Sequence, residues 1–310
     1  ELINIADKEF KWCEAELDKA AKDMKQKDRK AALNYVKGIY VPPGEQDLEV
    51  ARLGQESIDF TLARKFVTVP MLCLETWRLR MLDEKGQKMV PYASYGGQQV
   101  NVAYATETMT HEKKLMSMRG NNKHFLRNVI LHELVPGHHL QHFMQARHNT
   151  HRGLFSTPFY VEGWALYCEL QFWNMGFPQS PEDRIGMLFW RMHRCARIIV
   201  TLKYHLGQMK PPEMVKFLTD RVGHEPEAAR SEIRRFIHYR PLYQCGYMLG
   251  GMQLLKLHEE LVGEGKPYPR QQLFHDRVLM HGPIPIALLR RSFRDEKISK
   301  DLQPTWRFRD

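Results

Sequence analysis

The feature that most constrains this chain is an apolar helical repeat between residues 121 and 143 that a Pro-Gly pair interrupts. Apolar residues recur there at the three- and four-residue spacing of one helix face: Phe125, Leu126, Val129, Ile130 and Leu134. Asn121 or Asn122 is suited to cap the start of this helix. We therefore expect a helix that crosses the core and breaks at Pro136-Gly137, because proline cannot continue the hydrogen-bond ladder.

Metal-capable and acid–base side chains surround this break. His132 and Glu133 precede it, and His138 and His139 follow it directly. In a regular helix these later histidines would lie about 9 and 10.5 Å further along, too far to share one zinc ion with His132. Because proline removes a hydrogen bond and glycine tolerates unusual backbone angles, we expect a bulge that returns His138 toward His132. The alternative is a helix–break–helix with ordinary surface or core histidines.

A second expected helix, over residues 158–175, carries two glutamates. Glu162 and Glu169 are two helical turns apart and so project in the same direction. Their neighbours are Val, Trp, Ala and Leu, which indicates a buried position. A buried carboxylate needs a partner, such as a metal ion or a histidine. The alternative is that both carboxylates are solvated or cap a helix.

The remaining pattern predicts one mainly α domain over residues 1–310. A small β-sheet is expected at about 64–106, from an apolar run at Phe66–Pro70 and an alternating stretch after Gly96-Gly97. The metal-site helices fall at about 121–175. The full set of expected helices is 5–38, 47–62, 121–147, 158–175, 181–207, 211–222, 226–238, 244–263, 270–280 and 285–293.

Composition excludes several classes of protein. With 43% hydrophobic and 26% charged residues, the chain is typical of a soluble globular protein. No apolar run approaches the roughly 18 residues of a membrane span. The net charge of +10 is spread along the chain, so no nucleic-acid partner is expected. The five separated cysteines predict neither a disulfide framework nor a cysteine zinc site. The first residues are neither an initiator Met nor a signal peptide, which leaves the compartment unknown.

The two motifs together resemble a known family. The segments H-E-L-V-P-G-H-H-L-Q at 132–141 and E-G-W-A-L-Y-C-E at 162–169 are similar to the mainly bacterial family called domain of unknown function 885. That family is regarded as zincin-like, which implies a multi-helix metallopeptidase domain. The resemblance runs from about residue 90 to 293, with the whole chain as the wider alternative. Because family members are usually longer, the chain resembles their C-terminal part.

The site also resembles that of helical metallopeptidases such as angiotensin-converting enzyme. In those enzymes a glutamate ligand follows the second histidine by about two dozen residues, and Glu162 lies 24 residues after His138. The resemblance therefore implies His132, His138 and Glu162 as ligands of a Zn²⁺ ion. His139 is a rival ligand or a supporting residue. Glu169 is expected to accept the far ring N–H of a ligand histidine.

This resemblance implies a zinc-dependent hydrolase, in first place a peptidase that cleaves peptides. Glu133 is then the expected general base. Tyr239 and Tyr247 are the expected donors to the oxyanion, and Arg197 and Arg240 the expected partners of a substrate carboxylate.

Three points stay open in this interpretation. The strand at 97–102 is either an edge strand that receives an extended peptide or a plain structural strand. The substrate is either a peptide or a non-peptide amide or ester, since the same site suits both. The third alternative belongs to another class, a non-catalytic helical module that binds partners in its groove.

Overall fold

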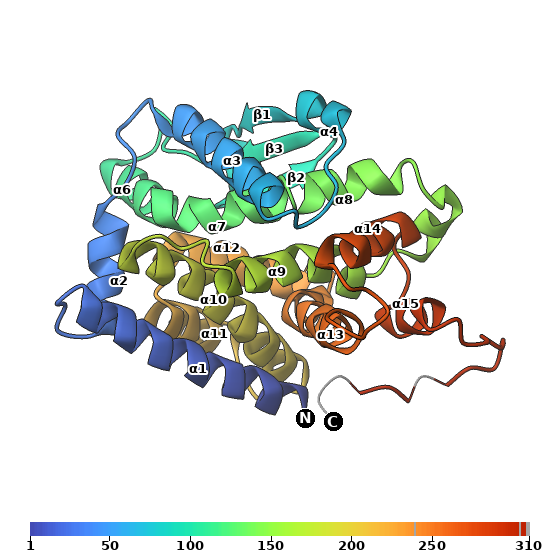
Figure 1. The fold of residues 1–310 in the computed structure, drawn as a ribbon. Helices are drawn as coiled ribbons and strands as arrows, with labels where there is room; N and C mark the ends of the chain where they lie inside the picture. The colour runs from blue at the N-terminus through green and yellow to red at the C-terminus, as the bar shows by residue number, and fades with distance from the viewer. Residues whose placement is uncertain (239, 304, 308–310) are drawn as a thin grey trace.

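The computed structural model describes residues 1–238, 240–303 and 305–307, and most of these residues are helical (Figure 1). Short 3-10 turns lie at Thr150–Phe155 and Tyr243–Cys245, and a π turn at Leu218–Val222. The helices are α1 (Leu2–Asp23), α2 (Arg29–Gly38), α3 (Gln46–Ala63), α4 (Met71–Thr76), α5 (Glu84–Gln87), α6 (His111–Gly120), α7 (Lys123–Glu133), α8 (His138–Gln145), α9 (Pro158–Asn174), α10 (Pro181–His205), α11 (Pro211–Phe217), α12 (Pro226–His238), α13 (Gly246–Leu261), α14 (Gln271–His281) and α15 (Ile286–Phe293).

Most predicted helices are present, but the long helix expected at 5–38 is wrong. The chain turns between α1 and α2, and the Asp28 side chain caps α2 by accepting the backbone N–H of Ala31 at 2.7 Å. Three helices were not predicted, namely α4, α5 and α6. The first two are short, and α6 has no apolar face of helical period, so no pattern indicated them.

The small sheet has three strands, β1 (Arg78–Met81), β2 (Ala93–Gly96) and β3 (Gln99–Val102). Their order is β1-β3-β2, with β1 parallel and β2 antiparallel to β3. Strand β3 is therefore central, so of the two alternatives for 97–102 the edge strand is wrong and the plain structural strand is correct. A turn with positive φ at Gly97 and Gln98 pairs β3 with β2, while β1 occupies its other side. The edge strand beside α7 is β2.

The strand expected at Phe66–Pro70 is also absent. This segment is irregular, and it leads from α3 into α4. Its Thr68 backbone N–H donates to the carboxylate of Asp276 at 2.7 Å instead of to a neighbouring strand. Phe66 is buried against Trp164 and Phe172, so the apolar character that suggested a strand serves packing between helices.

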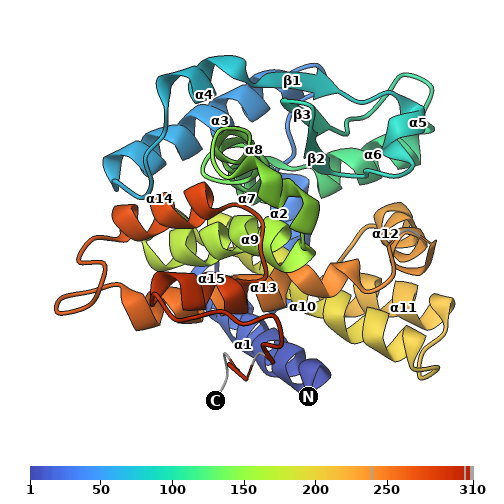
Figure 2. The same ribbon diagram turned by 90° about the vertical axis from the view of Figure 1, so that its right-hand side faces the viewer.

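The helices are arranged in layers around α7 and α8. The sheet and α3 lie on one side of α7, and α9 and α10 lie on the other, with α1 outside α10 (Figures 1 and 2). Helix α7 is buried on both sides, because Phe125 and Val129 belong to one apolar cluster and Leu126 and Ile130 to another. Its polar residues are therefore held inside the protein.

Helix α9 packs closely on α13 through paired glycines. A Cβ atom added at Gly163 would lie 2.7 Å from the carbonyl carbon of Gly250, which is closer than atoms can approach. Only glycine permits this contact, and it sets the position of Glu162 next in the chain. Among the described residues, none of the helices combines the length and the apolar character needed to cross a membrane.

Candidate metal centre

The predicted break in the central helix is present between α7 and α8. Residues 134–137 leave the helix, and the Val135–Pro136 peptide bond is cis. Two side chains hold this connection from opposite sides. The Ser57 hydroxyl of α3 donates to the carbonyl of Val135, and the indole N–H of Trp164 in α9 donates to the carbonyl of Pro136 at 2.8 Å. The break is therefore anchored to both neighbouring layers.

Gly137 is required by space as well as by its backbone angles. Its φ of −73° and ψ of −135° lie outside both the α and the β region, as expected for a glycine that serves an unusual conformation. A Cβ atom at this position would lie 1.8 Å from the carbonyl oxygen of His132. The absence of a side chain lets the chain fold back on α7 and brings His138 close to His132.

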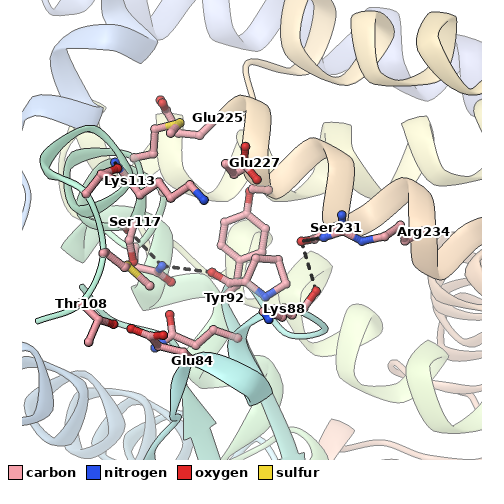
Figure 3. A pocket seen from close by; sticks show the side chains of 18 residues that line it. Glu84, Lys88, Tyr92, Thr108, Lys113, Ser117, Glu225, Glu227, Ser231 and Arg234 are labelled. Carbon is pink, nitrogen blue, oxygen red and sulfur yellow. Dashed lines mark hydrogen bonds between the residues drawn. The ribbon is translucent and has the colours of Figure 1, made fainter. Parts of the chain in front are cut away.

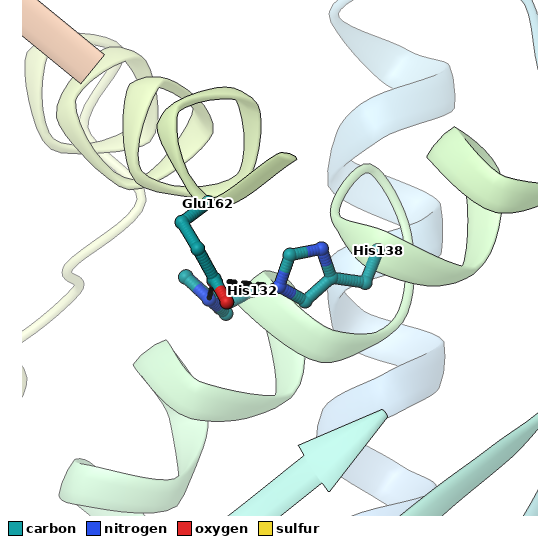
Figure 4. A group of neighbouring side chains, drawn as sticks. All are labelled: His132, His138 and Glu162. Atoms are coloured by element: carbon teal, nitrogen blue, oxygen red, sulfur yellow. Dashed lines mark hydrogen bonds and ion pairs between the residues drawn. The ribbon is translucent and has the colours of Figure 1, made fainter. Parts of the chain in front are cut away.

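The structure brings His132, His138 and Glu162 together (Figure 4). The Nε2 atoms of His132 and His138 lie 3.5 and 3.1 Å from Oε2 of Glu162. One ligand atom from each residue lies within 4.8 Å of the others, and all three side chains are buried. Among the described residues no other group of three His, Cys, Asp or Glu side chains meets this criterion.

Glu169 orients the imidazole of His132. Its Oε1 atom lies 2.6 Å from Nδ1 of His132 and also accepts from Arg194 at 3.1 Å. Its Oε2 atom accepts from Asn128 at 2.7 Å. Burial opposes the charge, but Arg194 and His132 outweigh it and lower the pKa of Glu169 to about 2. The ionised carboxylate accepts the Nδ1 proton, so Nε2 of His132 presents its lone pair to Glu162.

Gln141 orients His138 in the same way. Its amide N–H₂ donates to the carbonyls of Tyr160 and Val161, which turns its oxygen toward Nδ1 of His138 at 3.2 Å. Nδ1 is therefore a donor, and Nε2 of His138 also faces Glu162. Three electron pairs converge on one point, which requires a cation, either a proton or a metal ion. Burial lowers the pKa of His138, yet the Glu162 carboxylate outweighs burial and raises it to about 9.

Tyr243 is a site residue that the sequence did not reveal. Its hydroxyl donates to Oε1 of Glu162 at 2.6 Å and so holds the oxygen that faces away from the histidines. Burial and the Glu162 carboxylate raise the pKa of Tyr243, which keeps the hydroxyl protonated. The only sequence signal was its place between Tyr239 and Tyr247, the two tyrosines expected to donate to the oxyanion.

A cavity of about 140 Å³ opens beside the cluster. Glu133 lines it, 8% exposed, and its carboxylate has no hydrogen-bond partner among the described residues. Tyr247 also lines it, with its ring parallel to that of His132 and 5.9 Å away. The cavity therefore joins the three metal-capable side chains to a free carboxylate and a phenol.

Other predicted residues lie elsewhere. His139 was a rival ligand, but its Nε2 atom donates to the carbonyl of Cys73 at 2.7 Å and its Nδ1 atom accepts from Tyr95 at 3.0 Å. Both nitrogens are engaged away from the cluster, so His139 supports the fold. Arg240 is exposed beside the ring of Tyr243 and is not part of the cavity wall. Tyr239 lies outside the described residues, whereas Arg197 does line the cavity.

A larger cavity of about 290 Å³ lies between α6 and α12 (Figure 3). It shares Pro91 and Tyr92 with the cavity beside the histidines, so Tyr92 stands between the two. Asn121 lines it, and the Oδ1 atom of this buried side chain has no hydrogen-bond partner among the described residues. Within the part of the chain that the structure describes, no histidine lines this larger cavity, so its size does not make it the metal-capable site.

The fold has counterparts among solved structures. A protein from Shewanella oneidensis, described as a "putative lipoprotein of unknown function", matches with a TM-score of 0.78 at 19% identity, over 94% of this chain and 56% of its own. The "putative lipoprotein" from Colwellia psychrerythraea matches with a TM-score of 0.77 at 20% identity, over 95% of this chain and 51% of its own. This chain therefore has the mainly helical fold of these proteins and spans about half their length.

The sequence identifies the family more closely. The model of the family described as bacterial protein of unknown function, DUF885, matches residues 1–293, so this chain belongs to that family. The match begins at residue 1, so the wider alternative for the resemblance is correct and the range starting near residue 90 was too narrow. No curated protein matches the chain.

Proposed function

We propose that this chain carries the catalytic centre of a zinc-dependent hydrolase with a zincin-like site, and that its substrates are peptides. One observation supports this most, the convergence of two Nε2 lone pairs and a carboxylate beside a cavity that holds the free carboxylate of Glu133. Two His nitrogens and a Glu oxygen are a ligand set that suits catalytic zinc. When bound, zinc would polarise the scissile carbonyl and acidify a water molecule.

The chain's own residues would then carry out the proton transfers. Glu133 takes a proton from water as the water oxygen attacks the carbonyl carbon, and delivers it to the nitrogen as the C–N bond breaks. The Tyr247 hydroxyl stays protonated because burial and the Glu162 carboxylate raise its pKa. It donates to the carbonyl oxygen as negative charge develops there. Glu169 and Gln141 keep both imidazoles in the tautomer that presents Nε2.

The test compares zinc content and peptide hydrolysis in the wild type, Glu133→Gln and a control, Glu227→Gln. Glu227 is on α12 and pairs with Arg230 outside the histidine cavity. We expect about one zinc per chain in all three proteins. The Glu133→Gln variant should lose hydrolysis by roughly a hundredfold to ten-thousandfold, since that is the usual contribution of a general base.

Two results would overturn this proposal. The first is a wild type that binds no zinc with His132 and His138 intact. The second is hydrolysis by Glu133→Gln at the wild-type rate. A zinc-loaded protein that cleaves no peptide but does cleave simple amides or esters would favour the other hydrolase class, and binding of peptides without any cleavage would favour a binding module.

A further inference from the structure

The cavity beside the histidines is lined by three arginines as well as by carboxylates. Arg194 and Arg197 of α10 and Arg235 of α12 all line it. Arg194 and Arg197 are 4% and 3% exposed, so their charges are removed from bulk water. Buried guanidinium groups are normally paired with carboxylates, and the pairing here is incomplete.

Glu232 is shared between two of these arginines. Its Oε2 atom accepts from Arg197 at 2.9 Å, and its Oε1 atom accepts from Arg235 at 2.9 Å. Burial opposes the charge, but both arginines hold the pKa of Glu232 well below its usual range. One carboxylate is therefore shared by two guanidinium groups, and the carboxylates of Glu133 and Glu162 line the same cavity.

Two guanidinium N–H groups in this wall also lack an acceptor. The Nη1 atom of Arg197 and the Nε atom of Arg194 are buried and have no hydrogen-bond partner among the described residues. Buried donors of this kind are nearly always satisfied in folded proteins. An anionic group of a ligand would supply the missing acceptor.

A row of buried side chains leads to Glu232. The Tyr92 hydroxyl lies 2.6 Å from Nδ1 of His224, and Nε2 of His224 lies 2.8 Å from Nδ1 of His193. Nε2 of His193 lies 3.2 Å from Oε2 of Glu232 but makes no hydrogen bond among the described residues. Burial and Arg197 lower the pKa of His193 to about 3, so this ring is neutral and adds no charge beside Glu232. Glu232 is therefore held by its hydrogen bonds to Arg197 and Arg235.

We propose that Arg197 and Arg235 bind the terminal carboxylate of a peptide, so that the enzyme removes residues from the C-terminus of its substrate. A carboxylate suits a guanidinium because two oxygens meet two N–H groups in one plane. The proposal rests on the proposed peptidase function. It adds which end of the peptide is cleaved, and which chemical group of the substrate the cavity binds.

The dimensions of the site limit how many residues can be released from the C-terminus in one cleavage. The Cζ atom of Arg197 is 4.4 Å from the centre of the Tyr247 ring, and that ring is 5.9 Å from the His132 ring. The arginine is therefore at most roughly 10 Å from the histidine, and an extended chain spans about 3.3–3.6 Å per residue. This leaves room for one or two residues between the scissile bond and the terminal carboxylate.

The first experiment measures binding without turnover. Glu133→Gln protein is titrated by calorimetry with an N-acetylated tripeptide as the free acid and as its C-terminal amide. We expect the free acid to bind roughly tenfold to a hundredfold more tightly than the amide. A hydrogen bond to a charged group changes the affinity by about that factor. Adding Arg235→Gln should remove that preference. Arg234→Gln is the matched control, because Arg234 neighbours it on α12 but faces the larger cavity (Figure 3).

Arg197→Lys is the second variant, because it keeps the charge beside Glu232 but not the planar pair of donors. It should also lose the preference, with helical circular dichroism unchanged. Equal affinity for acid and amide in the Glu133→Gln protein, or a preference that survives both Arg235→Gln and Arg197→Lys, would overturn the proposed carboxylate site.

The second experiment identifies the products by mass spectrometry. The wild type should release one or two residues from the free acid and none from the amide. Internal cleavage of both peptides at equal rates would overturn the inference and leave the proposed peptidase standing. If neither peptide is cleaved by zinc-loaded protein, the peptidase proposal and the direction of attack fall together, while the binding preference still tests the arginine site by itself.

Discussion

Glu169→Gln tests how the protein orients His132. The carboxylate of Glu169 is 4% exposed and accepts from His132, Asn128 and Arg194. Glutamine has the same shape, but its amide has one acceptor atom and no charge. It can therefore satisfy only part of this network, and the His132 ring loses the anion that holds its Nδ1 proton.

The magnitude follows from these contacts. Loss of such a carboxylate beside a ligand histidine weakens metal binding by about tenfold to a hundredfold, or about 1.4–2.7 kcal/mol. Arg194 is 4% exposed and loses its charged partner as well. Breaking a buried pair costs about 3–5 kcal/mol, and the cost should be lower here because glutamine keeps one acceptor oxygen.

Two measurements separate these effects. Competition with a chelator gives the zinc affinity, and urea unfolding of the metal-free protein gives the free energy of unfolding. Glu259→Gln, at an exposed position on α13, is the control and should change neither. If Glu169→Gln binds zinc as tightly as the wild type, the argument that Glu169 orients His132 is wrong. A loss of stability alone would leave Glu169 with a structural role only.

Three further perturbations test the fold around the site. Gly163→Ala should lower the free energy of unfolding by about 1–3 kcal/mol in urea denaturation, because its Cβ would lie 2.7 Å from Gly250; unchanged stability would contradict this packing. Asn122→Ala should cost about 0.5–2 kcal/mol in the same assay, because its side chain accepts two N–H groups at the start of α7, each at 3.1 Å. Burial lowers the pKa of His275 to about 3, so the folded chain keeps it neutral while the unfolded chain is protonated below about 6.5. Stability should therefore fall by up to about 1.4 kcal/mol per unit as pH drops from 6.5 toward 3, and His275→Asn should reduce that slope; an equal slope would refute the assignment.

Local patterns predicted much of the helical architecture and the presence of one small sheet, but not the order of its strands. The spacing of apolar residues on α7 and α9 depends only on the period of the helix, which is why both helices and the break between α7 and α8 were predictable. The order of the strands depends on pairing between distant segments. The pattern at 97–102 therefore indicated a strand but could not show that β1 would cover its second edge.

The same distinction applies to the candidate site. The residues His132, His138 and Glu162 are recognisable because each lies in a short motif whose spacing resembles that of a family. Tyr243 and Glu232 are not, because a tyrosine or a buried glutamate in a helical region has many ordinary roles. Their contacts with Glu162 and Arg197 join segments 81 and 35 residues apart in sequence.

The sequence by itself determined that the chain is mainly helical, that its central helix breaks at Pro136-Gly137, and which side chains stand on either side of the break. These properties follow from local spacing and from the chemistry of proline and glycine. Only the tertiary structure decided that both Nε2 atoms face Glu162 and that three arginines line the cavity beside them. The reason is physical, because the orientation of a buried polar side chain depends on the hydrogen-bond partners that packing brings from other helices.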